Sequence, residues 1–110
     1  MTDLAMRKCE ACEGGVEPLK KKEVDVLLEQ VAGWAVNDAG TVISKTFQFK
    51  GFYKTMSLVN AIAWIANAEL HHPDMEVSFD RCTVHFTTHA INGLSENDFI
   101  CAAKVDALEG

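Results

Sequence analysis

All four histidines of the sequence fall between positions 71 and 89 of a chain of 110 residues. His71 and His72 are adjacent and stand directly before Pro73, and His85 and His89 follow on a later segment. Histidine has an unperturbed pKa of about 6.5, so near neutral pH one imidazole can donate a proton while another accepts one. A cluster of this kind is suited to an elimination or a tautomerisation, in which one proton is delivered while another is removed.

A metal site is the alternative use of the same side chains. Two or three histidines with Glu69 or Asp74 form a ligand set that suits Zn²⁺ or Fe²⁺. Adjacent histidines usually project in different directions, and His85 and His89 have metal-motif spacing but lie on a predicted strand rather than a helix. We therefore favour proton transfer over metal catalysis. The alternative is that these histidines have no catalytic role and are surface or hydrogen-bonding residues.

The four cysteines divide into an N-terminal pair and two single positions. Cys9 and Cys12 have half the spacing of a zinc ribbon, but no second pair completes it, and no role is assigned to them. A thioredoxin-like use would require the pair to open a helix after a strand, whereas it lies in an irregular segment. Cys82 and Cys101 have apolar neighbours and are expected to be small core residues. No serine or cysteine has an evident base partner for nucleophilic catalysis.

The elements that must position the histidines are predicted from apolar periodicity and turn residues. Residues 1–18 are irregular and are expected to form a flexible N-terminal arm, which leaves a single domain over residues 19–110. A helix is predicted from Lys20 until Gly33 stops it, because apolar side chains recur there at helical spacing. A short strand at residues 34–36 and a longer strand at residues 41–49 follow, with turn residues between them.

A long helix is predicted over residues 51–70, and it must end near the histidine pair because Pro73 disfavours helical geometry in the residue before it. Its apolar side chains cover more than the usual arc of a helix, which indicates a second contact such as another subunit. One continuous stripe runs along it: Phe52, Met56, Val59, Ala63, Ala66 and Leu70.

A hairpin is predicted over residues 75–87 with its turn at Asp80 and Arg81, and a last helix begins at Ser95. Asp98 has the capping-box spacing from Ser95 and is most simply a capping acid. The element order is helix, two strands, helix, two strands, helix. Hairpin-linked strands favour an α+β fold with an antiparallel sheet and helices on one face.

The composition excludes several classes of function. Ten Lys and Arg residues stand against sixteen Asp and Glu residues, a formal net charge of −6, whereas nucleic-acid binding rests on basic side chains that neutralise phosphates. No run of about 20 apolar residues is present, and no basic start leads into an apolar block, so we expect a soluble cytoplasmic protein without membrane contact. A chain this short has room for few catalytic side chains, and a second subunit is expected to complete its pocket.

Several short motifs, taken in order, resemble the pterin-4a-carbinolamine dehydratase family, and the resemblance spans residues 19–108. It implies an α+β fold with a four-stranded antiparallel sheet and three helices packed on one face, in the order α-β-β-α-β-β-α. The motifs are Gly33-Trp34, Phe49-Lys50-Gly51-Phe52, His71-His72-Pro73-Asp74, and Thr88-His89 followed by Gly93-Leu94-Ser95 and Asp98.

This resemblance also implies an activity. The family dehydrates 4a-hydroxytetrahydropterin, the carbinolamine left by pterin-dependent aromatic amino-acid hydroxylases, to the quinonoid dihydropterin, with no metal or organic cofactor. His71 and His89 are then the acid–base candidates, and His72, the third catalytic candidate, helps to hold the pterin. The residues implied as substrate-binding are Leu70, His71, His72, Thr87, Thr88, His89 and Ala90. The implied partners are further copies of the chain, in a dimer or tetramer, and an aromatic amino-acid hydroxylase in the same pathway.

The sequence also departs from the family pattern. Asn67 stands where many members carry a glutamate four residues before the first histidine, and Met75 stands where relatives often have an aromatic residue. His85 has no family role and is expected to be exposed. A second function remains open, a non-catalytic interaction or dimerisation module on the same fold, because animal members also act as dimerisation partners of a transcription factor through a helical face.

Overall fold

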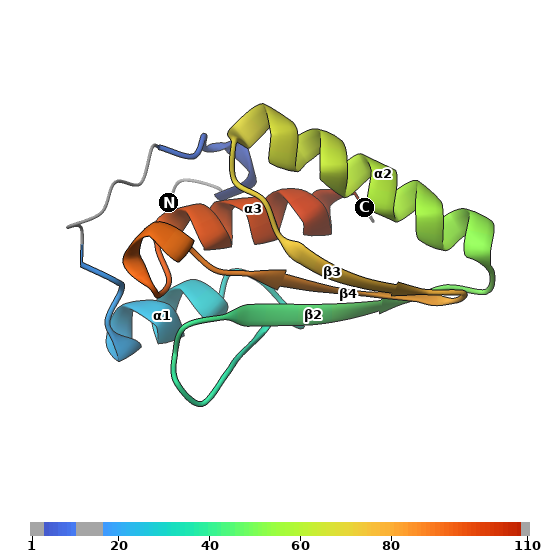
Figure 1. Ribbon diagram of the computed structural model, residues 1–110. Coiled ribbons are helices and arrows are strands. Elements are labelled where there is room, and N and C mark those ends of the chain that lie inside the picture. The colour runs from blue at the N-terminus through green and yellow to red at the C-terminus, as the bar shows by residue number, and fades with distance from the viewer. Residues whose placement is uncertain (1–3, 11–16, 109–110) are drawn as a thin grey trace.

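The computed structural model describes residues 4–10 and 17–108 of the chain (Figure 1). Within these residues it contains three α-helices, a four-stranded antiparallel sheet and two 3₁₀ turns. The α-helices are α1 (Lys21–Leu28), α2 (Phe52–Glu69) and α3 (Glu96–Ala107), the strands are β1 (Ala35–Val36), β2 (Ile43–Gln48), β3 (Asp74–Ser78) and β4 (Arg81–Phe86), and the 3₁₀ turns are η1 (Leu4–Met6) and η2 (His89–Ile91). None of the described helices is long and apolar enough to cross a membrane.

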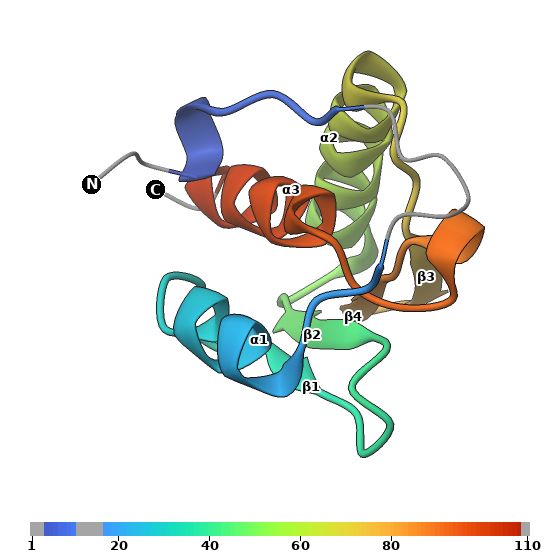
Figure 2. The ribbon, with the colours of Figure 1, turned by 90° about the vertical axis from the view of Figure 1, so that its left-hand side faces the viewer.

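The sheet has the strand order β1-β2-β4-β3, so β4 lies in its interior and β3 forms one edge. The three helices lie on the same side of this sheet (Figure 2). The predicted α+β fold and the order α-β-β-α-β-β-α are confirmed. The hairpin turn falls on Phe79 and Asp80, one residue earlier than predicted, because Arg81 already pairs with Ser78 and Gln48. The first helix ends at Leu28, yet Val31 beyond it is still buried through a tight turn.

The buried face of α2 differs from the predicted stripe. It consists of Thr55, Leu58, Ile62 and Ala66, whereas Phe52 and Leu70 at the two ends of the predicted stripe are exposed. The Thr55 hydroxyl donates to the Gly51 carbonyl at 2.9 Å and lies 3.2 Å from the Phe79 carbonyl. A threonine whose hydroxyl is hydrogen-bonded can therefore lie in the core, and a search for apolar periodicity does not find such a residue.

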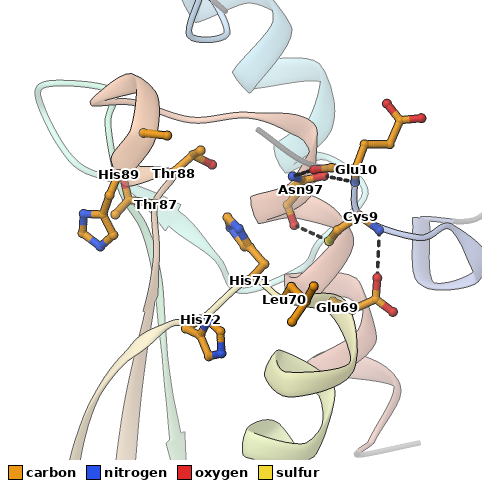
Figure 3. Close-up of a pocket in the computed structure, with 11 residues that line it drawn as sticks. Cys9, Glu10, Glu69, Leu70, His71, His72, Thr87, Thr88, His89 and Asn97 are labelled. Atoms are coloured by element: carbon orange, nitrogen blue, oxygen red, sulfur yellow. Dashed lines mark hydrogen bonds between the residues drawn. The ribbon is translucent and has the colours of Figure 1, made fainter. Parts of the chain in front are cut away.

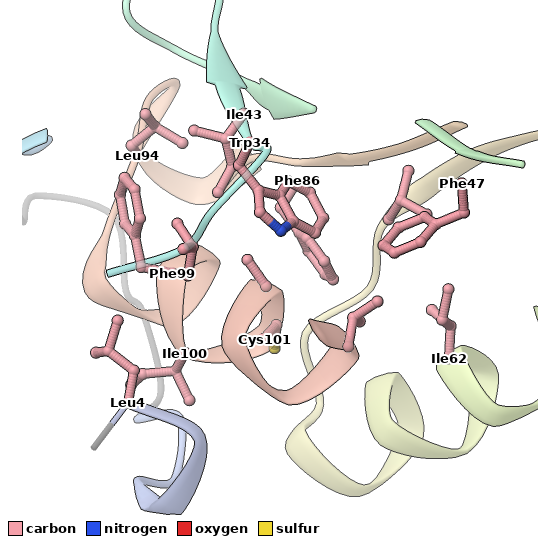
Figure 4. Close-up of a cluster of buried hydrophobic side chains, with 14 of the residues drawn as sticks. Leu4, Trp34, Ile43, Phe47, Ile62, Phe86, Leu94, Phe99, Ile100 and Cys101 are labelled. Carbon is pink, nitrogen blue, oxygen red and sulfur yellow. The ribbon is translucent and has the colours of Figure 1, made fainter. Parts of the chain in front are cut away.

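The hydrophobic core fills the space between the sheet and the helices packed on it, with α3 at its centre (Figure 4). Cys82, Val84 and Phe86 alternate along β4 and all point inward, as predicted, and Cys82 and Cys101 are fully buried core residues, also as predicted. The indole ring of Trp34 packs on Phe86 with ring centroids 5.8 Å apart. These contacts fix the interior strand β4, whose end leads directly into the second histidine segment.

Part of the N-terminal segment is packed against the body of the protein. Leu4 is only 3% exposed and joins the core beside α3 (Figure 4), and the Lys104 ammonium donates to the Ala5 carbonyl at 2.8 Å. Arg7 forms an ion pair with Glu96 at the start of α3. Residues 4–10 of the expected arm thus lie in contact with α3, a packing that an irregular sequence with few apolar residues does not indicate. Cys12 lies outside the described residues.

Candidate active site

A cavity of about 430 Å³ opens where the end of α2, the end of β4 and the start of α3 meet the N-terminal segment (Figure 3). This volume lies within the range of about 300–1,000 Å³ that is usual for small-molecule pockets. Its walls come from residues 9–10, 69–72, 87–90 and Asn97. All seven residues expected at the substrate site line this cavity, and three of the four histidines meet in it.

The first histidine pair is placed by the end of α2. Leu70 adopts a left-handed conformation with φ of 55°, and the His71 amide donates back to the Ala66 carbonyl at 3.1 Å. This closure ends the helix one turn short of Pro73 and reverses the direction of the chain. A non-glycine residue in this conformation costs about 1–3 kcal/mol, which the surrounding contacts offset. Consequently His71 points toward the protein interior, whereas His72 remains exposed at the mouth of the cavity (Figure 3).

The His71 ring is held on two sides. Its Nε2 lies 2.6 Å from Oδ1 of Asp98, a carboxylate with no exposed surface, and the ring stacks on Phe86 with an interplanar angle of 10°. The second carboxylate oxygen of Asp98 accepts hydrogen bonds from the Thr88 hydroxyl at 2.8 Å and from the Ser95 amide at 3.0 Å. Asp98 is therefore both the predicted helix cap and the partner of a pocket histidine.

These contacts determine the chemistry that His71 can perform. Asp98 accepts from the Thr88 hydroxyl and the Ser95 amide, and a carboxylate has no proton to donate, so we assign the proton of its contact with His71 to Nε2 of the imidazole. Among the described residues, Nδ1 of His71 has no hydrogen-bond partner. A neutral imidazole in this tautomer offers the Nδ1 lone pair as a proton acceptor.

His89 lies on the other side of the cavity from α2 (Figure 3). It is found in the turn η2 rather than on an extended strand, because Thr88 and Gly93 exchange backbone hydrogen bonds that close the loop behind it. Asn92 completes this loop in a left-handed conformation with φ of 52°. The His89 side chain is exposed, and within the described part of the chain it makes no hydrogen bond, so it is accessible to a molecule in the cavity.

The cavity wall formed by the N-terminal segment and Asn97 was not predicted. The Asn97 side chain clamps the backbone of Glu10, accepting from its amide at 3.0 Å and donating to its carbonyl at 2.6 Å. Glu69 accepts from the Cys9 amide at 2.8 Å, so it holds the N-terminal segment rather than an imidazole. These contacts join residues about 60 and 87 positions apart, and no local sequence pattern indicates them.

His85 lies outside the cavity, on the sheet face away from the helices. Its Nδ1 lies 2.5 Å from the Ser44 hydroxyl and its Nε2 lies 2.6 Å from Glu76, so it is partly buried rather than exposed as expected.

Asn67, the position of the family glutamate, is exposed on α2 and does not line the cavity. Within residues 4–10 and 17–108, no group of three or more His, Cys, Asp or Glu side chains is placed to hold a metal ion.

Comparison with known proteins identifies relatives over nearly the whole chain. A sequence model of the family described as pterin 4 alpha carbinolamine dehydratase matches residues 17–108. A protein of Nitrosomonas eutropha, named as a candidate pterin-4-alpha-carbinolamine dehydratase, is 60% identical over 107 residues, which cover 96% of this chain and 93% of the relative. A protein of Legionella pneumophila with the same name is 53% identical over 108 residues, which cover 97% and 96% of the two chains.

Two solved structures are similar as well. The crystal structure of a transcriptional coactivator/pterin dehydratase from Brucella melitensis has a TM-score of 0.81 and 30% identity, and the match covers 86% of this chain and 100% of that one. A pterin dehydratase-like protein identified as a RuBisCO assembly factor in the alpha-carboxysome has a TM-score of 0.62 and 22% identity, over 71% and 90% of the two chains, and it supports the fold alone. From the family match and the sequence identities, this chain belongs to the pterin-4-alpha-carbinolamine dehydratase family.

Proposed function

We propose that this protein dehydrates 4a-hydroxytetrahydropterin to the quinonoid dihydropterin by general acid–base catalysis, and so recycles the pterin cofactor of aromatic amino-acid hydroxylases. The observation that carries the proposal is the meeting of three histidines in one cavity, with the His71 ring held at 2.6 Å by the buried Asp98. The family match supports the choice of substrate.

In the proposed reaction, His71 accepts the proton of the ring N–H at its free Nδ1. His89 protonates the departing 4a-hydroxyl, so the C–O bond breaks with release of water while the nitrogen electron pair forms the C=N bond. The step transfers one proton in and one proton out and changes no oxidation state, and therefore needs no redox cofactor. Asp98 is a positioning residue that fixes the tautomer and orientation of His71.

The remaining cavity residues serve binding in this proposal. His72 at the cavity mouth and the segment of residues 87–90 contact the pterin, and Leu70 contributes an apolar surface at the end of α2. The Thr87 hydroxyl donates to the Thr41 carbonyl at 2.6 Å, which fixes the start of this segment on the loop before β2. In this proposal the flat bicyclic substrate lies between the end of α2 on one side and the segment of residues 87–90 on the other.

The test is a coupled assay in which a pterin-dependent hydroxylase supplies the carbinolamine and its dehydration is followed directly. We expect His71→Ala and His89→Ala each to slow dehydration by about 10²- to 10⁴-fold, the usual contribution of general acid–base catalysis. The matched control is His85→Ala, which removes a histidine outside the cavity. Wild-type rates in both pocket variants would refute the proposal, and a rate that falls on addition of a chelator would favour the metal alternative.

A second candidate function, an interaction module, is favoured by one observation. Large apolar side chains remain exposed along α2 and the edge strand β3, including Tyr53 at 88% and Trp64 at 75% exposure. Such surfaces mark protein contacts, here with another copy of the chain or with a foreign partner. Light scattering of the wild type and of Trp64→Glu would reveal self-association through this face. Recovery of a stable foreign partner with the wild type but not with Trp64→Glu would support the module instead.

A further inference from the structure

Two cysteines that are far apart in the sequence meet behind the cavity wall. The sulfur atoms of Cys9 and Cys101 lie 3.5 Å apart, although 92 positions separate these residues. Cys101 is fully buried on α3, whereas Cys9 is partly exposed and lines the cavity. A disulfide requires a sulfur separation of about 2.05 Å, so a shift of about 1.5 Å would join the two side chains.

The segment that carries Cys9 is attached to the body by polar contacts. The Cys9 amide donates to Glu69 at the end of α2, and the Asn97 amide group forms two hydrogen bonds with the Glu10 backbone (Figure 3). The Cys9 sulfur lies 3.7 Å from the Asn97 carbonyl, which directs it toward α3. A covalent bond at Cys9 would therefore fix the cavity wall formed by residues 9 and 10.

We propose that Cys9 and Cys101 form a reversible disulfide that locks the N-terminal segment onto α3 beside the cavity. The oxidant is a small-molecule disulfide such as oxidised glutathione. The Cys9 thiolate attacks one sulfur of the oxidant, forming a mixed disulfide and releasing one thiolate. The Cys101 thiolate then attacks the Cys9 sulfur and displaces the second thiolate, so two protein thiols are oxidised while one small disulfide is reduced to two thiols.

The order of these steps follows from the surroundings of the two thiols. The pKa of the Cys101 thiol is raised, mainly by its hydrogen bond with Cys9 and secondly by its burial, so Cys101 is a poor first nucleophile. Cys9 is partly exposed at the cavity and can meet the oxidant directly. Once the Cys9 sulfur is in the mixed disulfide, it no longer forms the thiol hydrogen bond that is the main cause of the raised pKa of Cys101, so Cys101 can lose its proton and resolve the adjacent disulfide.

The test uses the full chain, oxidised with glutathione disulfide under native conditions and mapped by mass spectrometry without reduction. We expect a cross-linked peptide pair containing Cys9 and Cys101, lost on addition of dithiothreitol. Cys12→Ala should retain the cross-link, and Cys82→Ala, which removes another buried thiol, is the matched control. Glutathionylated Cys9 without a cross-link, a Cys9–Cys12 link in the wild type, or no reaction at Cys9 would each overturn the proposal.

Locking has its own readout. Hydrogen exchange of the Cys9 and Glu10 amides, which are bonded to Glu69 and Asn97, should slow in the oxidised protein and recover after reduction. Exchange that is unchanged by a formed cross-link would refute the lock. Formation of the bond does not depend on the proposed dehydratase activity, so a protein that cross-links but never dehydrates the carbinolamine would contradict only the activity.

Discussion

Two imidazole–carboxylate contacts in this protein have the same length and different surroundings. His71 meets Asp98 at 2.6 Å, and His85 meets Glu76 at 2.6 Å. The Asp98 side chain has no exposed surface, whereas the Glu76 side chain is 75% exposed. An exposed pair is screened by water and contributes about 0–1 kcal/mol, but a buried carboxylate that loses its donors is strongly destabilising. The distance alone therefore does not distinguish a site from a surface contact.

Strand alternation explains why the two histidines differ. Phe86 on β4 points into the core and stacks on the His71 ring, while its neighbour His85 points to the opposite face of the sheet. There the His85 ring contacts the Ser44 hydroxyl on the neighbouring strand β2, on the face of the sheet opposite the three described helices (Figure 2). Histidines that lie close in sequence thus divide between a pocket and a surface, and their surroundings determine which of them can act on a substrate.

The largest expected effect separates these two histidines by activity. His71→Ala removes the proposed proton acceptor, so dehydration in the coupled assay should fall by about 10²- to 10⁴-fold. His85→Ala removes a side chain outside the cavity and should leave the rate near that of the wild type. Circular dichroism of both variants verifies that the fold is retained. Equal losses in the two variants would show that the comparison does not identify the site.

The next effect concerns the two carboxylates. Asp98→Asn keeps the shape but replaces one acceptor oxygen with an NH₂ group, whereas the Thr88 hydroxyl, the Ser95 amide and, in the assigned tautomer, Nε2 of His71 all donate to Asp98. An NH₂ group facing His71 forces the proton onto Nδ1, the wrong tautomer for a base. We expect slower dehydration, mainly through kcat, together with a loss of about 1–3 kcal/mol in the free energy of unfolding measured in urea. The control is Glu76→Gln, and a full wild-type kcat in Asp98→Asn would exclude the positioning role.

The sequence predicts the element order well because that order depends on local signals. Alternation over residues 82–86 and the cap at Ser95 are both found in the structure. The apolar stripe read along α2 shares only Ala66 with the buried face, because apolar side chains lie on all sides of this helix and a hydrogen-bonded threonine, Thr55, occupies part of the core face. Periodicity cannot rank several apolar faces when packing against distant elements selects among them.

The candidate site was also predictable only in part, because some of its residues lie in recognisable local motifs and others are brought in by contacts between distant segments. The segments of residues 70–72 and 87–90 are recognisable from short motifs, and both line the cavity. The second role of Asp98 was missed, since a capping acid is the simplest local interpretation and its contact with His71 spans 27 positions. The wall at Cys9 depends on side chains of α2 and α3 that bind an irregular backbone, which no pattern within that segment indicates.

A double-mutant cycle sharpens the comparison in energetic terms. For His71 and Asp98, the coupling free energy from urea unfolding of both single variants and the double variant should be about 1.5–3 kcal/mol, as for hydrogen bonds to buried charged groups. For His85 and Glu76 it should be about 0.2–1 kcal/mol. Alanine is used at all four positions so that the two cycles are matched. Equal coupling energies would mean that burial does not distinguish the two contacts.

The smallest expected effect tests whether solvent weakens the contact between His85 and Glu76. Glu76→Gln should lower the free energy of unfolding by less than about 1 kcal/mol at low salt. The Glu76 side chain is largely exposed, and holding it against His85 costs side-chain entropy that offsets most of the attraction. In about 1 M NaCl the Debye length falls to about 3 Å, so the difference between Glu76→Gln and the wild type should shrink further. The cost of Asp98→Asn should persist in the same salt, because ions do not reach a carboxylate with no exposed surface. A salt-independent cost at Glu76 would place both contacts in the same class and remove the distinction between the pocket and the sheet face.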